Sequence, residues 1–474
     1  MVFSSVTFLL YFLPVFILVY TLLPKKLKNW FILIASVAFY SWGAPKFVFI
    51  LVGSTVLDYY IVQSLFRTVI QKKKKIFLFL SIGMNLGLLA YFKYANFFIE
   101  NVNAALTGVG IESISWTNIA LPIGISFYTF QTLTYSIDVY RGLHAPFKKI
   151  HNYLVYILSF PQMIAGPIVR FNEIADQIID RTEVIDDKIF GFYRFSIGLA
   201  KKVLIANVLG EYASDIMSID GPGLNTSLAW IGIIAYTFQI YFDFSGYSDM
   251  AIGLGKIMGL SFPENFDNPY NSRSITEFWR RWHMTLGHWM KNYLYIPLGG
   301  NKANSKSRLY LNLWIVFLIS GLWHGASWNF VIWGAFHGLF LILDRLFLKS
   351  ILDKVGVIPS VLFTFMVVVI GWVFFSIENF SEAIQYLTTM FSFNFTSTHV
   401  ALSSEFMVTL LFAIVISFAH LTRVGKLLQG IIYHSGVISN VRAIVLASVG
   451  ILTYFICVAY VTSADFNPFI YFRF

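Results

Sequence analysis

The chain has 474 residues, of which 57% are hydrophobic and only 12% are charged. An ordinary soluble domain carries about 25% charged residues, so this composition excludes a soluble globular protein. The formal net charge is +10, but the basic residues gather in short segments between apolar blocks. That distribution indicates membrane topology and argues against nucleic-acid binding.

Long apolar blocks begin at the N-terminus and recur along the chain, for example at residues 6–23, 47–57, 76–92 and 451–461. A membrane-spanning helix needs about 20 mostly apolar residues, and such runs predict about eleven to thirteen membrane segments. The first block follows no basic residue and shows no small-residue cleavage pattern, so we expect a retained helix. We predict an all-α integral membrane protein in which residues 1–474 form a single polytopic domain.

The lysine clusters predict how the chain is threaded. Lysines within residues 25–28, 72–75 and 148–149 should be cytoplasmic, because cytoplasmic loops are enriched in basic residues. Two crossings separate each cluster from the next, which places the nearly uncharged residues 101–116 outside. The N-terminus is then expected to face out.

The single cysteine, Cys457, lies in an apolar run. One cysteine allows no internal disulfide and no cysteine-based metal cluster. We expect Cys457 to be buried as a small hydrophobic residue.

Residues 243–337 interleave polar side chains, glycines and tryptophans. Such a sequence is tolerated at membrane depth only where it is buried in protein or lines a wet cavity, so we expect a cavity here. Asp243 and Ser245 open this region. They could orient a histidine, bind a polar substrate, or cap and join helices.

Ser274 and Glu277 form a capping-box pattern and predict a helix start just before Phe278. We expect one continuous helix through residue 290, with Trp279, Trp282 and His283 on a single face. Either this helix lies at the membrane surface with its tryptophans at the headgroups, or His283 faces the cavity. A buried histidine needs partners for its ring nitrogens.

Residues 321–338 carry glycine pairs four residues apart, which predict close helix packing around His324. An ionisable residue in an apolar membrane segment is a candidate functional group. His324 could accept a hydroxyl proton as a general base, because an unperturbed histidine has a pKa near 6.5. The developing oxyanion would need donors such as backbone N–H groups, Asn329 or a second histidine.

A metal site is the alternative use of this histidine-rich region, which holds His283, His288, His324 and His337. Their spacing does not match an HExxH site, and no cysteine or paired carboxylate completes a ligand set. We expect no metal.

Two motifs, WRRWH at 279–283 and LWHGASWNFVIWGAFHG at 322–338, resemble the membrane-bound O-acyltransferase (MBOAT) family. The resemblance implies that His324 is catalytic and that His283 is the family's second polar position. Further motifs resemble its bacterial alginate O-acetyltransferase branch: FKYANFF at 92–98, LPIGISFYTF at 121–130, IAGPIVRF at 164–171, YFDFSGYSDMAIGLG at 241–255, ENFDNPY at 264–270 and FIYFRF at 469–474.

The resemblance implies a ring of transmembrane and re-entrant helices around a central funnel in a bacterial cytoplasmic (inner) membrane. No bound cofactor is expected. The donor would be a cytoplasmic acyl thioester such as acetyl-CoA. The acceptor would be an extracytoplasmic acetyltransferase partner protein or an exported polysaccharide such as alginate or peptidoglycan. D-alanyl transfer to a wall polymer is the alternative within this family. The expected substrate-binding or cavity-lining residues are Trp279, Trp282, Trp323, Asn329, Asp243 and Ser245.

Two other classes also fit a chain of many apolar helices. A polysaccharide or lipid transporter would need intramembrane polar groups and cytoplasmic lysines, but no unique histidine. A noncatalytic scaffold of an export complex would use His283 and His324 only for local hydrogen bonds.

Overall fold

The computed structural model describes residues 2–219, 223–303, 305–396, 401–433 and 439–463. These residues form helices joined by loops, and there is no β-strand among them, which confirms the all-α prediction. Their contacts fall into two compact units. Unit 1 comprises Met1–Phe3, Thr7–Val184 and Gly255–Phe262, and unit 2 comprises Ser4–Val6, Ile185–Leu254 and Pro263–Phe474.

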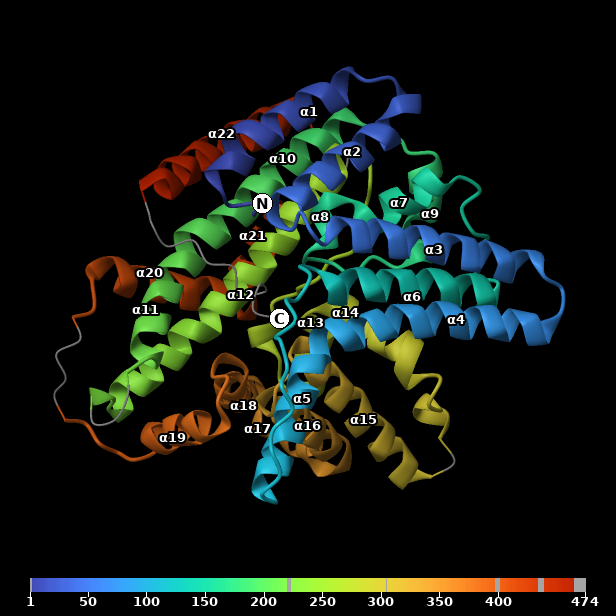
Figure 1. Ribbon diagram of the computed structural model, residues 1–474. Helices are drawn as coiled ribbons and strands as arrows, with labels where there is room; N and C mark the ends of the chain where they lie inside the picture. Colours follow the sequence, from blue (N-terminus) through green and yellow to red (C-terminus); the bar gives the residue numbers. More distant parts are fainter. Residues whose placement is uncertain (1, 220–222, 304, 397–400, 434–438, 464–474) are drawn as a thin grey trace. The chain divides into compact units, whose positions relative to one another are not determined.

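Unit 1 holds the first nine α-helices and two short π-helical turns. They are η1 (Thr7–Phe12), α1 (Leu13–Leu22), α2 (Lys25–Gly43), α3 (Val48–Arg67), α4 (Gln71–Leu89), η2 (Ala90–Tyr94), α5 (Ala95–Gly108), α6 (Ile125–Arg141), α7 (Ile150–Leu158), α8 (Phe160–Met163) and α9 (Phe171–Ile179). Helices α3, α4 and α6 pack side by side (Figure 1).

Unit 2 holds the remaining helices, apart from the last three residues of α12. They are α10 (Ile185–Ala200), η3 (Lys201–Ala206), α11 (Asn207–Met217), α12 (Thr226–Ile257), η5 (Pro269–Asn271), α13 (Ile275–Arg281), α14 (Met284–Trp289), η6 (Met290–Tyr295), η7 (Gly300–Lys302), α15 (Lys306–His324), α16 (Trp328–Leu343), η8 (Asp344–Leu348), α17 (Lys349–Val355), α18 (Val357–Ser376), α19 (Phe380–Met390), α20 (Ser404–Phe418), η9 (Ala419–Leu421), α21 (Arg423–Tyr433) and α22 (Asn440–Ser463). Helix α22 lies along α10 (Figure 1). Cys457 on α22 is buried, as expected.

Six helical stretches within the described chain are long and apolar enough to cross a bilayer, and the chain is a multi-pass membrane protein. They are Val48–Arg67, Gln71–Gly108, Trp328–Val355, Val357–Ser376, Ser404–Leu421 and Asn440–Ser463. The expected total of about eleven to thirteen segments also counted re-entrant helices. The remaining described helices are shorter or more polar than these six.

Unit 1 is tied together by a buried carboxylate, Asp58 on α3. Its oxygens accept hydrogen bonds from Asn85 Nδ2 at 2.9 Å and Tyr153 Oη at 2.6 Å, and also from the Ser81 hydroxyl. Ser81 in turn contacts Ser136 on α6. Buried polar groups must find partners, so this network fixes how four helices of unit 1 face one another.

Helices α15 and α16 form the closest helix pair of unit 2, and their glycines make that closeness possible. A Cβ atom added to Gly321 would lie 2.1 Å from the Phe330 carbonyl oxygen, and one added to Gly334 would lie 2.3 Å from the Phe317 oxygen. Real Cβ atoms do not approach backbone this closely. The predicted tight packing around His324 is therefore confirmed.

We predict that Gly334→Val destabilises the protein by about 1–3 kcal/mol or more, because the added methyl groups must push α15 away from α16. The matched control is Gly83→Val on α4, where an added Cβ meets nothing within 4 Å. Thermal unfolding in detergent measures the midpoint temperature of both variants. Equal midpoints for the two variants would contradict the close-contact argument.

Candidate active site

The sequence around His283 forms two short helices instead of the continuous one expected. The start is as predicted: Ser274 caps α13 by accepting a hydrogen bond from the Glu277 N–H at 3.1 Å. However, α13 ends at Arg281, and His283 takes a left-handed conformation with φ +45°. The single-helix prediction was wrong, because bonds from a distant segment replace the helical ladder at this point.

That distant segment is the loop after α12. The backbone oxygen of Asn265 accepts from Met284 N at 2.9 Å, and its side-chain oxygen accepts from Thr285 N at 3.3 Å. The first N–H groups of a helix have no partner within the helix. Asn265 therefore caps α14 from outside, which allows the chain to turn at His283 and start again.

His283 is buried, so the expected face of this segment does point inward. Its exposed fraction is 1%, and Trp282 and Leu286 are also buried, whereas His288 is exposed. Its Nδ1 lies 3.0 Å from Asn265 Oδ1. The segment is therefore not a helix at the membrane surface with its tryptophans at the headgroups.

His324 ends α15 and is buried among aromatic rings. Its ring centroid lies 5.1 Å from that of Trp333 and 5.3 Å from that of Phe375. The His283 ring lies 6.5 Å from the His324 ring at a steep angle, with Trp323 close to both. The structure thus brings together the two histidines that the sequence singled out.

The two tryptophans of α13 and the residue after it, Trp279 and Trp282, make different aromatic contacts. Trp282 stacks on Phe278 and also contacts Phe266 edge-on and Trp372 at a tilt. Trp279 packs instead on Trp333 and His337, with ring centroids 5.4 and 5.0 Å apart.

Asn329 lies in the first turn of α16, where its side-chain nitrogen donates to the backbone oxygen of Ile377. This bond joins the start of α16 to the residue that follows α18. Asn329 thereby helps to hold the helix that carries Trp333 against His324.

Asp243 and Ser245 lie on α12, and both are buried. Asp243 forms an ion pair with Lys202 of the π-helical turn η3, with Nζ and Oδ1 2.7 Å apart. The Ser245 hydroxyl has no hydrogen-bond partner in the described part of the chain. An ion-pair partner of Asp243 is thus a lysine that the sequence analysis did not single out.

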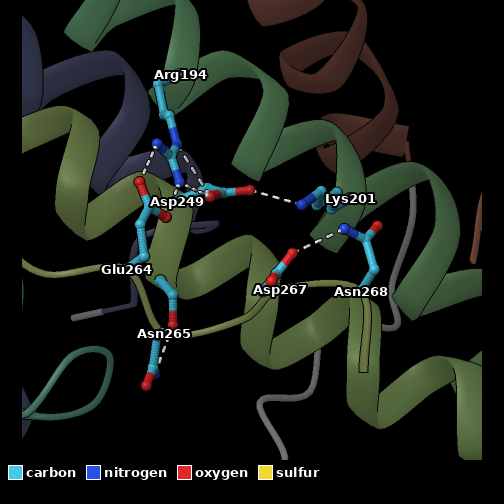
Figure 2. Close-up of polar contacts among 8 residues, drawn as sticks. Arg194, Lys201, Asp249, Glu264, Asn265, Asp267 and Asn268 are labelled. Atoms are coloured by element: carbon cyan, nitrogen blue, oxygen red, sulfur yellow. Dashed lines mark hydrogen bonds and ion pairs between the residues drawn. The ribbon is translucent and has the colours of Figure 1, made fainter. Parts of the chain in front are cut away.

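A second ion cluster joins α10 to α12 (Figure 2). Arg194 Nη2 donates to Asp249 Oδ1 at 2.8 Å, and Arg194 Nη1 donates to Glu264 Oε1 at 2.7 Å. Lys201 approaches the other Asp249 oxygen at 2.6 Å. Glu264 directly precedes Asn265, so the cluster anchors the segment that caps α14. The sequence offered no local signal for these partners, because they lie up to 70 residues apart.

Among the described residues, no group of three or more His, Cys, Asp or Glu side chains is arranged to hold a metal ion. His337 is fully buried beside Trp279 and Trp333. Trp333 lies next to both His337 and His324, with ring centroids 5.1 Å apart in each pair.

Comparison with known proteins places these residues in a family. A pattern described as "MBOAT, membrane-bound O-acyltransferase family" matches residues 146–377, which include both histidines. The chain is 44% identical to the probable alginate O-acetylase AlgI of Pseudomonas putida, over 83% of this chain and 81% of that protein. The chain belongs to the membrane-bound O-acyltransferase family. It is therefore an acyltransferase.

Other MBOAT relatives are named for different reactions. The peptidoglycan O-acetyltransferase of Helicobacter pylori is 36% identical over 83% of this chain and 80% of its own length. The teichoic acid D-alanyltransferase of Bacillus subtilis is 29% identical over 48% of this chain and 60% of its own length. The MBOAT resemblance of the sequence motifs is thus confirmed. The C-terminal motif FIYFRF lies outside the described residues.

His283 lies outside the six candidate spans, and burial lowers its pKa to about 3. An unfolded histidine has a pKa near 6.5, so below that pH the unfolded state binds more protons than the folded state. Stability should therefore fall as the pH drops from about 6.5 toward 3, by up to about 1.4 kcal/mol per pH unit from this group.

We predict that His283→Gln flattens the fall in unfolding temperature between about pH 6 and about pH 4, because a neutral amide binds no proton in either state. The exposed His288 provides the control: His288→Gln should leave the slope of the native protein unchanged. Identical slopes for His283→Gln and the native protein would show that His283 is not held neutral by burial.

Proposed function

We propose that this MBOAT protein moves an acetyl group from a cytoplasmic acyl thioester, acetyl-CoA, for O-acetylation of an exported cell-envelope polysaccharide. The observation that carries the proposal is the meeting of His324 and His283 within unit 2, with ring centroids 6.5 Å apart. The names of the relatives from Pseudomonas putida and Helicobacter pylori, each an O-acetylating enzyme, support the acyl group and the class of acceptor.

In the proposed reaction His324 acts as the general base. It removes the proton of the acceptor hydroxyl as that oxygen attacks the thioester carbonyl, and it returns the proton to the departing thiolate. The new bond is the ester C–O bond, and the bond that breaks is C–S. Because His324 is the last residue of α15, the partial negative charge of the helix C-terminus favours the imidazolium that forms.

The remaining predicted site residues receive supporting roles in this proposal. Trp323 lies next to both histidines, and Trp282 packs in the aromatic cluster of Phe266, Phe278 and Trp372. Trp279 and Asn329 hold the helices that carry these groups. Asp243 and Ser245 shape the α12 wall.

We further propose a single membrane domain of residues 1–474 in the bacterial inner membrane, in contact with membrane lipid. An extracytoplasmic acetyltransferase partner protein would receive the acetyl group, or pass it on to the polysaccharide. Many large hydrophobic side chains are exposed on the six candidate spans, which supports a lipid environment.

We predict that His324→Ala lowers the turnover of labelled acetyl-CoA by about 100- to 10,000-fold in the purified protein reconstituted in liposomes, since general-base catalysis contributes about that much. His288→Ala, at an exposed position of α14, should retain native turnover. Unfolding temperatures establish that the variants are folded. Full activity of a folded His324→Ala protein would refute its role as the base.

A second candidate is D-alanyl transfer, which the match to the Bacillus subtilis teichoic acid D-alanyltransferase favours. The same liposomes supplied with a D-alanyl thioester separate the two candidates. Turnover of the D-alanyl thioester without turnover of acetyl-CoA would select this alternative.

The proposed threading places the N-terminus outside and residues 72–75 in the cytoplasm. Two single-cysteine proteins test it in a Cys457→Ser background: Thr107→Cys at the end of α5 and Lys73→Cys in the first turn of α4, both exposed. A membrane-impermeant maleimide should label Thr107→Cys in intact spheroplasts, and Lys73→Cys only after permeabilisation. The reverse labelling pattern would invert the topology.

A further inference from the structure

Asn265 connects His283 to residues of unit 2 that are distant in the sequence. On one side its neighbour Glu264 is bound by Arg194, and its own Nδ2 donates to Ser248 Oγ on α12 at 3.0 Å (Figure 2). On the other side its Oδ1 faces His283 and Thr285. The side chain is therefore held at both ends and cannot rotate freely.

The bonds to Thr285 determine which end of the Asn265 amide faces His283. The backbone N–H of Thr285 points at this amide atom from 3.3 Å, and the Thr285 hydroxyl contacts the same atom at 2.8 Å. A backbone N–H can only donate, so the atom that it meets must be the amide oxygen. Amide orientation is assigned from such networks, and here an unambiguous donor decides it.

The orientation of the amide in turn decides where the proton of His283 lies. Nδ1 of His283 is 3.0 Å from Asn265 Oδ1, and an amide oxygen can only accept. Nδ1 must therefore carry the hydrogen. A neutral imidazole has one N–H, so Nε2 presents a lone pair.

This lone pair lies inside the site. Nε2 is buried and has no hydrogen-bond partner among the residues described. The ring is flanked by Phe244, with centroids 4.7 Å apart, and by Trp323 and His324. A buried acceptor left unsatisfied costs about 1–3 kcal/mol, so the site favours a ligand that donates a hydrogen bond there.

We propose that Asn265 is a positioning residue that holds His283 in the Nδ1–H tautomer, so that His283 Nε2 receives a hydroxyl hydrogen of the acceptor beside His324. The tautomer follows from the hydrogen bonds alone, whereas the use of Nε2 rests on the proposed function. In this arrangement neutral His283 orients the acceptor and cannot donate to the oxyanion. Where the acceptor is a sugar, which carries several hydroxyls, the one held by His283 is a neighbour of the one that His324 deprotonates.

The tautomer is tested directly by solid-state NMR of the full-length protein in liposomes, labelled with ¹⁵N-histidine. The His283 signals are assigned by their loss in His283→Gln. At neutral pH we expect a protonated Nδ1 and an unprotonated Nε2, without any substrate present. A protonated Nε2 in the native protein would overturn the proposal, whether or not the protein turns over acetyl-CoA.

Variants of Asn265 test its positioning role. Asn265→Asp keeps an oxygen for His283 and Thr285, so it should retain the hydrogen on Nδ1 and a larger kcat/KM than Asn265→Leu does. Asn265→Leu removes the oxygen; it should release the tautomer and lower kcat/KM by about 100-fold, the order of effect expected for a misplaced catalytic group.

Ser248→Ala is the matched control, because it removes only the contact on the α12 side of Asn265 and should preserve the tautomer. If Asn265→Leu does not fold, the spectra of the native protein, Asn265→Asp and Ser248→Ala still decide the assignment. An Asn265→Asp protein that shows an unprotonated Nδ1 would refute the role of Asn265. Absence of acetyl-CoA turnover in the native protein would count against the proposed function and leave the tautomer result intact.

Discussion

The buried ion pairs between α10, η3 and α12 are the interactions on which the site depends. Arg194 and Lys201 meet Asp249, and Lys202 meets Asp243, all with side chains largely removed from solvent. A buried charge that loses its partner costs about 3–5 kcal/mol, so these helices have one compatible arrangement. Lys201 and Lys202 are consecutive residues of the π-helical turn η3, and they pair with two different carboxylates of α12.

The loop after α12 connects this ion cluster to the two histidines. Glu264 binds Arg194 (Figure 2). The next residue, Asn265, caps α14 and holds His283. The strained left-handed backbone of His283 persists because these bonds compensate for it. The ion cluster therefore acts on the site at a distance, by fixing a loop, and none of its charges needs to touch the reacting groups.

His324 is positioned by different means. It stands at the end of α15, which glycines bring against α16, and it rests on Trp333 from that second helix. Close backbone packing gives this helix pair a rigid arrangement, as is common where membrane helices meet. His283 is thus positioned by its contact with Asn265, and His324 ends a helix that packs tightly on its neighbour, so that the two rings lie 6.5 Å apart.

The sequence by itself determined the membrane character, the all-α class, the cap at Ser274, the close packing at Gly321 and Gly334, and the candidacy of His324 and His283. Each of these follows from a local pattern: apolar run length, capping spacing, glycine spacing, or an ionisable group in an apolar segment. Only the tertiary structure decided that the helix breaks at His283, that Lys202 neutralises Asp243, and that Asn265 orients the histidine ring. These depend on hydrogen bonds and ion pairs between residues from 18 to 70 positions apart, and no local periodicity encodes which distant partner will satisfy a buried polar group.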